Sequence, residues 1–169
     1  MSSKDNAEQR GKSMPSKNFT GPVEADIREI WTTLSGFGHI ADWHPDITSS
    51  RIDNGMPETM PGAVRHLDMR DGNVIKEELL TLDPELMTLS YRFTHSPLPW
   101  DNYVCVIRVS EQKNAAGTLV SQVCWSATFD VRNPGEEAIN EARLHQIMVT
   151  SHSGLRAFLL QGPATIQTS

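Results

Sequence analysis

Residues 62–83 read GAVRHLDMRDGNVIKEELLTLD and predict two antiparallel strands joined by a tight turn at Asp71-Gly72. An Asp-Gly pair between two alternating segments is the strongest short-range indication of a β-hairpin. Side chains two residues apart share one face of a strand, so each inward face should be mostly apolar but hold one charge, Arg65 or Glu77. The other members of these faces are Ala63, Leu67, Met69, Ile75, Leu79 and Thr81. Because a lone buried charge costs several kcal/mol, Arg65 and Glu77 need each other, water or a ligand.

Length and composition limit the possible classes of protein. The 169 residues suggest one domain, and 38% hydrophobic with 21% charged residues is typical of a globular chain. A net charge of −6 and a pI near 5.4 indicate no basic surface, so we expect no nucleic-acid partner. No apolar run approaches the roughly 20 residues that span a bilayer. The N-terminus also has no apolar signal segment, so we expect a cytoplasmic protein without membrane insertion, either a monomer or a homodimer.

The two cysteines agree with a reducing compartment. Cys105 and Cys124 belong to separate predicted strands and should point to opposite faces of the sheet. A disulfide between them would need both side chains on one side, so we expect free thiols.

Around the central hairpin, the remaining segments predict one domain over residues 16–163, with a disordered tail at 1–15 and a short tail at 164–169. A first strand at 19–23 is followed by two short helices at 24–34 and 36–43. The further strands are predicted at 47–52, 87–94, 100–109 and 120–130, with a long helix at 136–160. On that helix the expected apolar stripe contains Leu144, Ile147, Met148, Leu155, Phe158 and Leu159, with His145 and His152 off it.

This order predicts an α+β fold. Six strands in antiparallel succession can join the first strand in one curved seven-stranded sheet, which closes by wrapping around the long C-terminal helix. Such an arrangement, called a helix grip, tends to leave a hollow between sheet and helix.

The chain resembles the START/Bet v 1-like helix-grip superfamily, and within it the bacterial SRPBCC proteins called polyketide cyclase/dehydrase. The resemblance covers about residues 18–160 and rests on the segments IWTTLSGFGHIADWHPDI (30–47), PGAVRHLDMRDG (61–72), KEELLTLD (76–83), LSYRFTHSPLPWDNYVCVIRV (89–109) and VCWSATFDV (123–131). It implies the fold more strongly than any chemistry, because the superfamily contains enzymes, carriers and receptors.

Two branches of the superfamily suggest roles for single residues. Plant lachrymatory factor synthases have an arginine, a glutamate and a tyrosine that fall on Arg65, Glu77 and Tyr103. Plant abscisic-acid receptors have a lysine that falls on His44, and their gate and latch loops fall on 70–73 and 96–99. The lysine and both loop sequences are absent from this chain, which argues against hormone perception.

Three residues are the candidate catalytic groups. The planar fork of Arg65 suits a carboxylate, enolate or sulfenate oxygen. Glu77, with its pKa raised by an apolar hollow and lowered by Arg65, could transfer a proton at neutral pH, and Tyr103 could donate a hydrogen bond to the same oxygen. The alternatives are a structural ion pair for Arg65 and Glu77 and plain packing for Tyr103.

His44 is expected at the mouth of the hollow, where it either binds a ligand or caps a helix end. The expected walls of the hollow comprise Leu79, Tyr91, Phe93, Cys105, Trp125, Phe129, Ser151 and Gly154, each of which could equally serve only the core. The loops around Asp71-Gly72 and 97–99 should flank the mouth as a lid. No metal-ligand spacing, phosphate-binding loop or nucleophile elbow occurs in the sequence, so we expect neither a metal nor a cofactor.

These features support three hypotheses. The first is a cofactor-independent cyclase, isomerase or dehydratase that acts by acid–base catalysis on a small hydrophobic, oxygenated molecule. The second is a carrier or sensor that binds such a molecule unchanged. The third is a scaffold whose hollow is filled by side chains.

Overall fold

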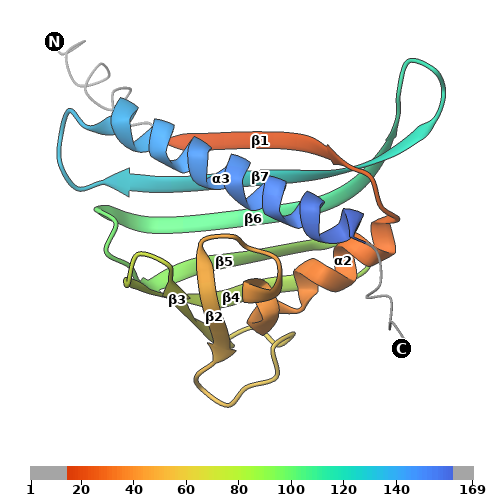
Figure 1. The fold of residues 1–169 in the computed structure, drawn as a ribbon. Helices are drawn as coiled ribbons and strands as arrows, with labels where there is room; N and C mark the ends of the chain where they lie inside the picture. Colours follow the sequence, from red (N-terminus) through yellow and green to blue (C-terminus); the bar gives the residue numbers. More distant parts are fainter. Residues whose placement is uncertain (1–14, 162–169) are drawn as a thin grey trace, which may run out of the picture.

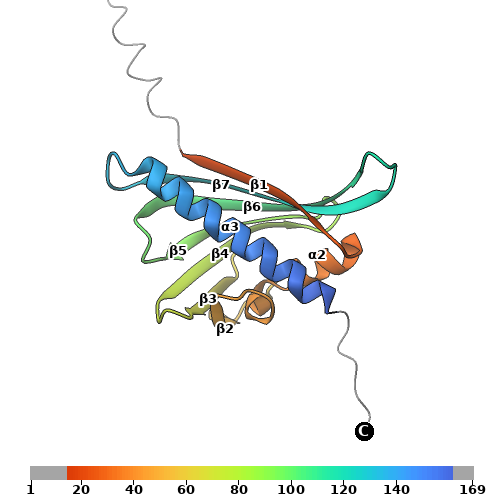
Figure 2. The same cartoon turned by 45° about the horizontal axis from the view of Figure 1, so that its top comes forward.

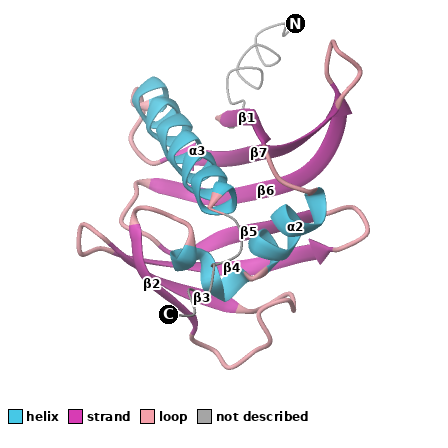
Figure 3. Ribbon diagram, turned by 45° about the vertical axis from the view of Figure 1, so that its right-hand side comes forward, coloured by secondary structure: helices cyan, strands magenta, loops and turns pink. Residues whose placement is uncertain are grey.

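A single antiparallel sheet of seven strands curves around one long helix (Figures 1 and 3) in this computed structural model, which describes residues 15–161. The strand order across the sheet is β1-β7-β6-β5-β4-β3-β2. The strands are β1 (Ser16–Val23), β2 (Ile47–Ile52), β3 (Val64–Met69), β4 (Val74–Asp83), β5 (Thr88–His95), β6 (Trp100–Lys113) and β7 (Leu119–Val131), and the helix is α3 (Glu137–Leu160). This architecture confirms the predicted α+β helix grip.

The ends of the sheet differ modestly from the sequence prediction. β1 begins three residues earlier than expected, and the backbone N–H of Phe129 donates to the carbonyl of Pro15, 3.1 Å away. Apart from Pro15, the tails predicted at 1–15 and 164–169 lie outside the described residues. The hairpin between β6 and β7 projects beyond the rest of the sheet (Figures 1 and 2).

Two short helices connect β1 to β2. The first, α2 (Ile27–Ser35), starts later than predicted because Asp26 caps it, with its carboxylate accepting from the backbone N–H of Arg28 at 2.8 Å. The second, η2 (Phe37–Asp42), is a 3₁₀ helix that packs against β2 and β3. Both place apolar side chains in the core, and Leu34 of α2 and Ile40 of η2 line the hollow.

The helix α3 packs mainly against β1 and β7, and its C-terminal end lies near α2 (Figures 1 and 2). Leu144, Met148 and Leu155 are buried as predicted, but Ile147 and Phe158 remain more than a third exposed. In their place three polar residues face inward, Asn140, Ser151 and His152. The expectation that His152 lies off the buried face was therefore wrong. Within residues 15–161, no helix is long and apolar enough to cross a membrane.

These inward polar groups on α3 are hydrogen-bonded, which makes their burial tolerable. The indole N–H of Trp100 donates to Asn140 Oδ1 at 2.9 Å, and that of Trp125 donates to His152 Nδ1 at 3.2 Å. The other ring nitrogen of His152 lies 3.0 Å from the carbonyl of Pro22, so Nε2 holds the proton. Gly21 makes room for this ring, because a Cβ there would lie 2.6 Å from His152 Nε2.

Bulges change which side chains face the core. A register shift between Leu79 and Thr81 turns Thr81 outward, so the prediction that it shares the inward face of β4 was wrong. A second shift, between Asp101 and Val104, includes Asn102 at φ 55° and lets both Trp100 and Tyr103 face inward. Simple alternation along β6 would have placed those two on opposite faces.

Candidate functional site

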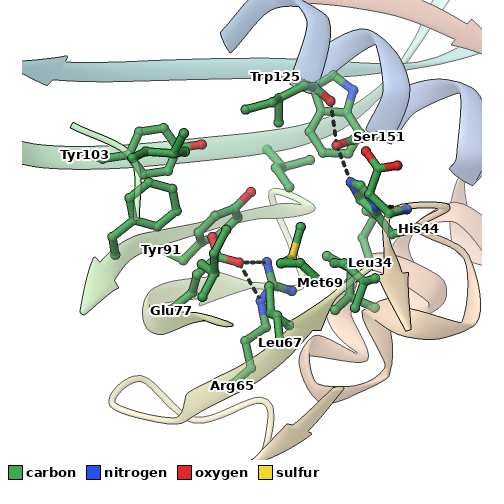
Figure 4. Close-up of a pocket in the computed structure, with 18 of the residues that line it drawn as sticks. Leu34, His44, Arg65, Leu67, Met69, Glu77, Tyr91, Tyr103, Trp125 and Ser151 are labelled. Carbon is green, nitrogen blue, oxygen red and sulfur yellow. Dashed lines mark hydrogen bonds and ion pairs between the residues drawn. The ribbon is translucent and has the colours of Figure 1, made fainter. Parts of the chain in front are cut away.

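A cavity of about 110 Å³ lies between the sheet and the helices. Eight of the residues predicted for the site line it, and most of them are labelled in Figure 4: His44, Arg65, Glu77, Tyr91, Phe93, Tyr103, Trp125 and Ser151. The cavity is thus mostly apolar with a few convergent polar groups, which is the usual composition of a small-molecule site.

Arg65 and Glu77 face each other directly across the β3–β4 pair and point into this cavity (Figure 4). Their side chains are only 4% and 6% exposed. Arg65 Nη2 lies 3.1 Å and Nε 3.2 Å from the same carboxylate oxygen, Oε1 of Glu77. The predicted hairpin, its inward charges and their contact are therefore all present.

The guanidinium of Arg65 is held from two further elements. Its Nη1 donates to the carbonyl of Phe37, 3.1 Å away, at the start of η2. Its Cζ lies 4.0 Å from the ring centre of Phe37 and 4.7 Å from that of Tyr91. Such cation–π contacts stabilise a desolvated guanidinium, so the cation has a fixed position at the cavity wall.

Glu77 uses its two oxygens differently. Oε1 interacts with Nε and Nη2 of Arg65, whereas Oε2 receives no hydrogen bond from any residue in the described part of the chain. Burial raises the pKa of Glu77, and the charge and hydrogen bond of Arg65 oppose that rise. A carboxyl group with a raised pKa is a stronger base when ionised and a more available acid when protonated at neutral pH.

Aromatic side chains from β5 and β6 form the wall beside this pair. Phe93 stacks on Tyr103 with ring centres 4.0 Å apart. Burial raises the pKa values of Tyr91 and Tyr103 well above their ordinary range, so both hydroxyls stay protonated and can donate. Burial also raises the pKa of Cys105 to about 11, and its neutral thiol is a poor nucleophile.

His44 and Ser151 join the segment after η2 to α3 across the cavity from Arg65. His44 Nε2 lies 2.8 Å from Ser151 Oγ, and His44 Nδ1 accepts from the backbone N–H of Asp46 at 3.2 Å. The ring proton is therefore on Nε2, and the hydroxyl of Ser151 donates to the carbonyl of Ile147. Burial lowers the pKa of His44 to about 4. Because these hydrogen bonds run from histidine to serine, this pair does not activate a serine nucleophile.

Four predicted wall residues do not line the cavity. Leu79 pairs with Tyr91 across β4 and β5, and Cys105 pairs with the same tyrosine across β5 and β6. Phe129 packs with its ring centre 4.8 Å from that of Trp100. Gly154 leaves no free space, because a Cβ there would lie 2.5 Å from Pro45 Cδ and 2.7 Å from the Trp43 carbonyl oxygen. The glycine thus allows close approach of α3 to the end of η2 rather than room for a ligand.

Several residues of the site were not predicted. Phe37, whose carbonyl accepts from Arg65, lies in the short helix predicted at 36–43, for which no site residue was predicted. Trp100 became a wall residue through the bulge in β6, which alternation does not predict. The more exposed lining residues belong to the segment after η2, the adjoining ends of β3 and β4, the β5–β6 loop and α3, and they are Asp46, Met69, Ile75, Leu98 and Ile147. Of the two loops predicted to act as a lid, 97–99 contributes Leu98 to the lining, whereas no residue of the turn around Asp71-Gly72 does; the lid itself stays a prediction.

Metal ligands do not cluster in the described part of the chain. Within residues 15–161, no three His, Cys, Asp or Glu side chains form a group that could hold a metal ion. Cys105 and Cys124 are both free, and Cys105 faces inward, while Cys124 lies half-buried on the opposite face of the sheet.

Comparisons with solved structures agree with this fold. An uncharacterized protein from Bacillus thuringiensis is 32% identical, with 85% of this chain and 98% of that chain covered and a TM-score of 0.71. The protein XoxI from Bacillus cereus is 31% identical over 89% of this chain and 100% of that chain, with a TM-score of 0.72. The major latex-like protein 151 of Panax ginseng, 17% identical, shares the fold over 84% of this chain and 95% of that one, with a TM-score of 0.64.

Comparison with family models identifies the family. A search of curated proteins finds no significant match. The model described as "Polyketide cyclase / dehydrase and lipid transport" matches residues 18–157. This range includes nearly all of α3 and all seven strands, apart from the first two residues of β1. The chain therefore belongs to the polyketide cyclase / dehydrase and lipid transport family, as its sequence segments suggested.

Proposed function

We propose that this protein is a cofactor-independent enzyme that moves a proton on a small, oxygenated hydrophobic molecule inside the cavity. The observation that supports this most is that the two carboxylate oxygens of Glu77 have different contacts. One of its oxygens holds Arg65, and the other has no partner among the described residues although the carboxyl group lines an apolar cavity. Arg132 contacts a single oxygen of Asp101 in the same way, but that pair is about half exposed to solvent, whereas Glu77 is buried and its second oxygen has no such access to water.

The proposed chemistry begins with Glu77 as a general base. Its carboxylate removes a proton from the carbon next to a carbonyl group, and the electron pair moves to the carbonyl oxygen. The negative charge thus passes from Glu77 to the enolate oxygen, while Arg65, already fixed by Phe37 and Tyr91, stays beside both. Because the cation needs no reorganisation when the charge moves, this arrangement stabilises the transition state.

The protonated Glu77 then returns its proton. Delivery to a different carbon gives an isomerisation, delivery to a departing hydroxyl gives dehydration with loss of water, and delivery to a carbonyl oxygen attacked by the enolate carbon gives a cyclisation. The hydroxyl of Tyr103 can donate to the same oxygen as Arg65. Neither a metal nor an organic cofactor takes part in these proposed steps. We also propose that the protein acts in the cytoplasm, a reducing compartment that agrees with its two free thiols.

A carrier or sensor of hydrophobic molecules is the alternative. The description of the family includes lipid transport, and the cavity walls are largely apolar. In that case Arg65 and Glu77 would bind the polar end of a ligand without changing it.

Deuterium exchange separates the two functions. Acetophenone, a one-ring ketone, is incubated with the protein in D₂O, and the loss of its methyl proton signal is followed by NMR. An enzyme of the proposed kind accelerates this loss, and Glu77→Gln lowers the acceleration by about 10²–10⁴-fold. Glu78→Gln is the matched control, because Glu78 lies on the opposite face of β4, paired with Arg92. Binding without acceleration, or equal rates for wild type and Glu77→Gln, would contradict catalysis and favour a carrier.

A further inference from the structure

The buried charges of the cavity limit the ligands that it can take. Arg65 is a permanent cation, and within the described residues its only anionic contact is Oε1 of Glu77. The pair is therefore neutral as it stands. An anionic ligand beside Arg65 would place a second negative charge next to Glu77 in an apolar enclosure, where two carboxylates cannot both stay ionised.

The hydrogen-bonding groups lead to the same class of ligand. Oε2 of Glu77 is an unused acceptor. Arg65 has five N–H donors, of which Glu77 and Phe37 occupy three, so two remain for a ligand. A group with an acceptor oxygen next to an O–H satisfies both sides at once. Neutral carboxylic acids and the enols of 1,3-dicarbonyl compounds have this arrangement.

From these two observations, and resting on the function proposed above, we propose that the cavity holds one negative charge beside Arg65, on Glu77 or on the ligand but not on both. It therefore takes weak organic acids together with one proton. The anion, one proton from solvent and the free site combine, and the proton lies between Glu77 Oε2 and the ligand oxygen.

Other ionisable groups near Glu77 do not take up this proton from solvent. Those that face it from neighbouring strands are Arg65 on β3, which is a permanent cation, and Tyr91 on β5 with Tyr103 and Cys105 on β6, whose pKa values burial raises so that they are already protonated at neutral pH. Across the cavity, His44 is neutral above a pKa of about 4 and donates to Ser151. Asp46 lies at the exposed rim.

Ligand size is limited as well. A cavity of about 110 Å³ is of the same order as an apolar protein cavity of about 150 Å³ that binds benzene. One-ring probes are therefore appropriate, and benzoate and benzamide form a matched pair. They have the same shape, and both combine an acceptor with a possible donor, but only benzoate must gain a proton to become neutral.

Isothermal titration calorimetry at pH 7 in buffers of different ionisation enthalpy counts the protons. We expect close to one proton taken up for each benzoate and none for benzamide. We also expect benzoate affinity to fall about tenfold per pH unit between pH 6 and pH 8, while benzamide affinity stays constant. In Glu77→Gln, benzoate should bind at least tenfold more tightly at pH 8 than in wild type and without proton uptake. Glu78→Gln should behave as wild type.

Several results would overturn the inference. They are benzoate binding without proton uptake, equal uptake with benzamide, uptake that persists in Glu77→Gln, and no binding of either probe at millimolar concentration. If Glu77→Gln does not fold, the comparison of benzoate with benzamide binding to the wild-type protein still tests the inference. If benzoate binds without proton uptake but the protein still accelerates deuterium exchange of acetophenone, the inference about the ligand is wrong and the proposed function stands. If benzoate binds with uptake of one proton but acetophenone exchange is not accelerated, the protein is not the proposed enzyme and the inference about weak-acid ligands stands.

Discussion

Replacing Arg65 by methionine would leave Glu77 without its counter-charge inside the core. Methionine keeps a flexible apolar chain against Phe37 and Tyr91, so most of the packing should survive. The main loss concerns Glu77, whose side chain is 6% exposed and would be a buried, unpaired carboxylate. Removing one partner of a buried pair typically costs about 3–5 kcal/mol.

The penalty has an upper limit set by protonation. An isolated buried carboxylate becomes neutral when that is less costly than staying charged. Protonating a glutamate of ordinary pKa at pH 7 costs about 1.36 kcal/mol for each of about 2.7 pH units, or about 3.7 kcal/mol. At pH 5 the same step costs only about 1 kcal/mol. We therefore expect Arg65→Met to lower the free energy of unfolding by about 3–4 kcal/mol at pH 7 and by much less at pH 5.

The sign of this pH dependence follows from the direction of the change. Burial raises the pKa of Glu77, and removal of Arg65 takes away the group that opposes the rise. In the variant the folded protein binds the proton at a pH where the unfolded chain has released it. Stability is then present at low pH and is lost as the pH rises from the ordinary pKa of glutamate toward the raised one.

Urea unfolding followed by circular dichroism at pH 5, 6 and 7 measures these values. Arg92→Met is the matched control, because it breaks the exposed Arg92–Glu78 pair on the outer face of the same region and should cost at most about 1 kcal/mol. The double variant Arg65→Met/Glu77→Leu should recover most of the lost stability, since it removes both buried charges. A loss below about 1 kcal/mol for Arg65→Met, or a loss independent of pH, would refute the account of a desolvated pair.

Three further predictions concern the other side of the cavity and the wall. Gly154→Ala should lower the free energy of unfolding by about 1–3 kcal/mol in urea, because its Cβ would meet Pro45 and the Trp43 carbonyl, and a stabilised variant would contradict this contact. Because burial lowers the pKa of His44 to about 4, its contribution to the free energy of unfolding should be complete above pH 6.5 and fall by up to about 3 kcal/mol toward pH 4. The difference in the free energy of unfolding between wild type and His44→Gln, measured in urea, should therefore change over this range, and a difference independent of pH would contradict the prediction. Tyr103→Phe should slow acetophenone exchange about 10–100-fold with binding little changed, and an unchanged rate would exclude a role for its hydroxyl.

Local patterns were sufficient to predict most of the fold. The alternation of apolar residues predicted that Arg65 and Glu77 face inward. The observed register pairs Asp68 with Val74 and Arg65 with Glu77 around a three-residue turn at 70–72, whereas a two-residue turn at Asp71-Gly72 would have paired Arg65 with Glu78. Alternation predicted the inward residues of β7 and those of β6 from Tyr103 onward, because these stretches have one buried side. Besides these strand patterns, the prediction of the fold needed only a long helix around which the sheet could curve.

The errors arose where tertiary contacts override local patterns. The shift at Leu79 and Thr81 exchanges the faces of β4, and no residue type in KEELLTLD indicates a bulge there. His152 and Asn140 face inward because two tryptophan N–H groups need acceptors, a requirement visible only when the strands and the helix are placed together. A backbone carbonyl such as that of Phe37 gives no sequence pattern at all.

The central claim is that Glu77 is a desolvated carboxyl group whose proton affinity exceeds that of an ordinary glutamate. A pH titration of the ¹³C resonance of its carboxyl carbon measures this directly, with Glu77→Gln identifying the signal. We predict a midpoint clearly above the ordinary glutamate pKa of about 4.3. A midpoint at or below that value would contradict the account.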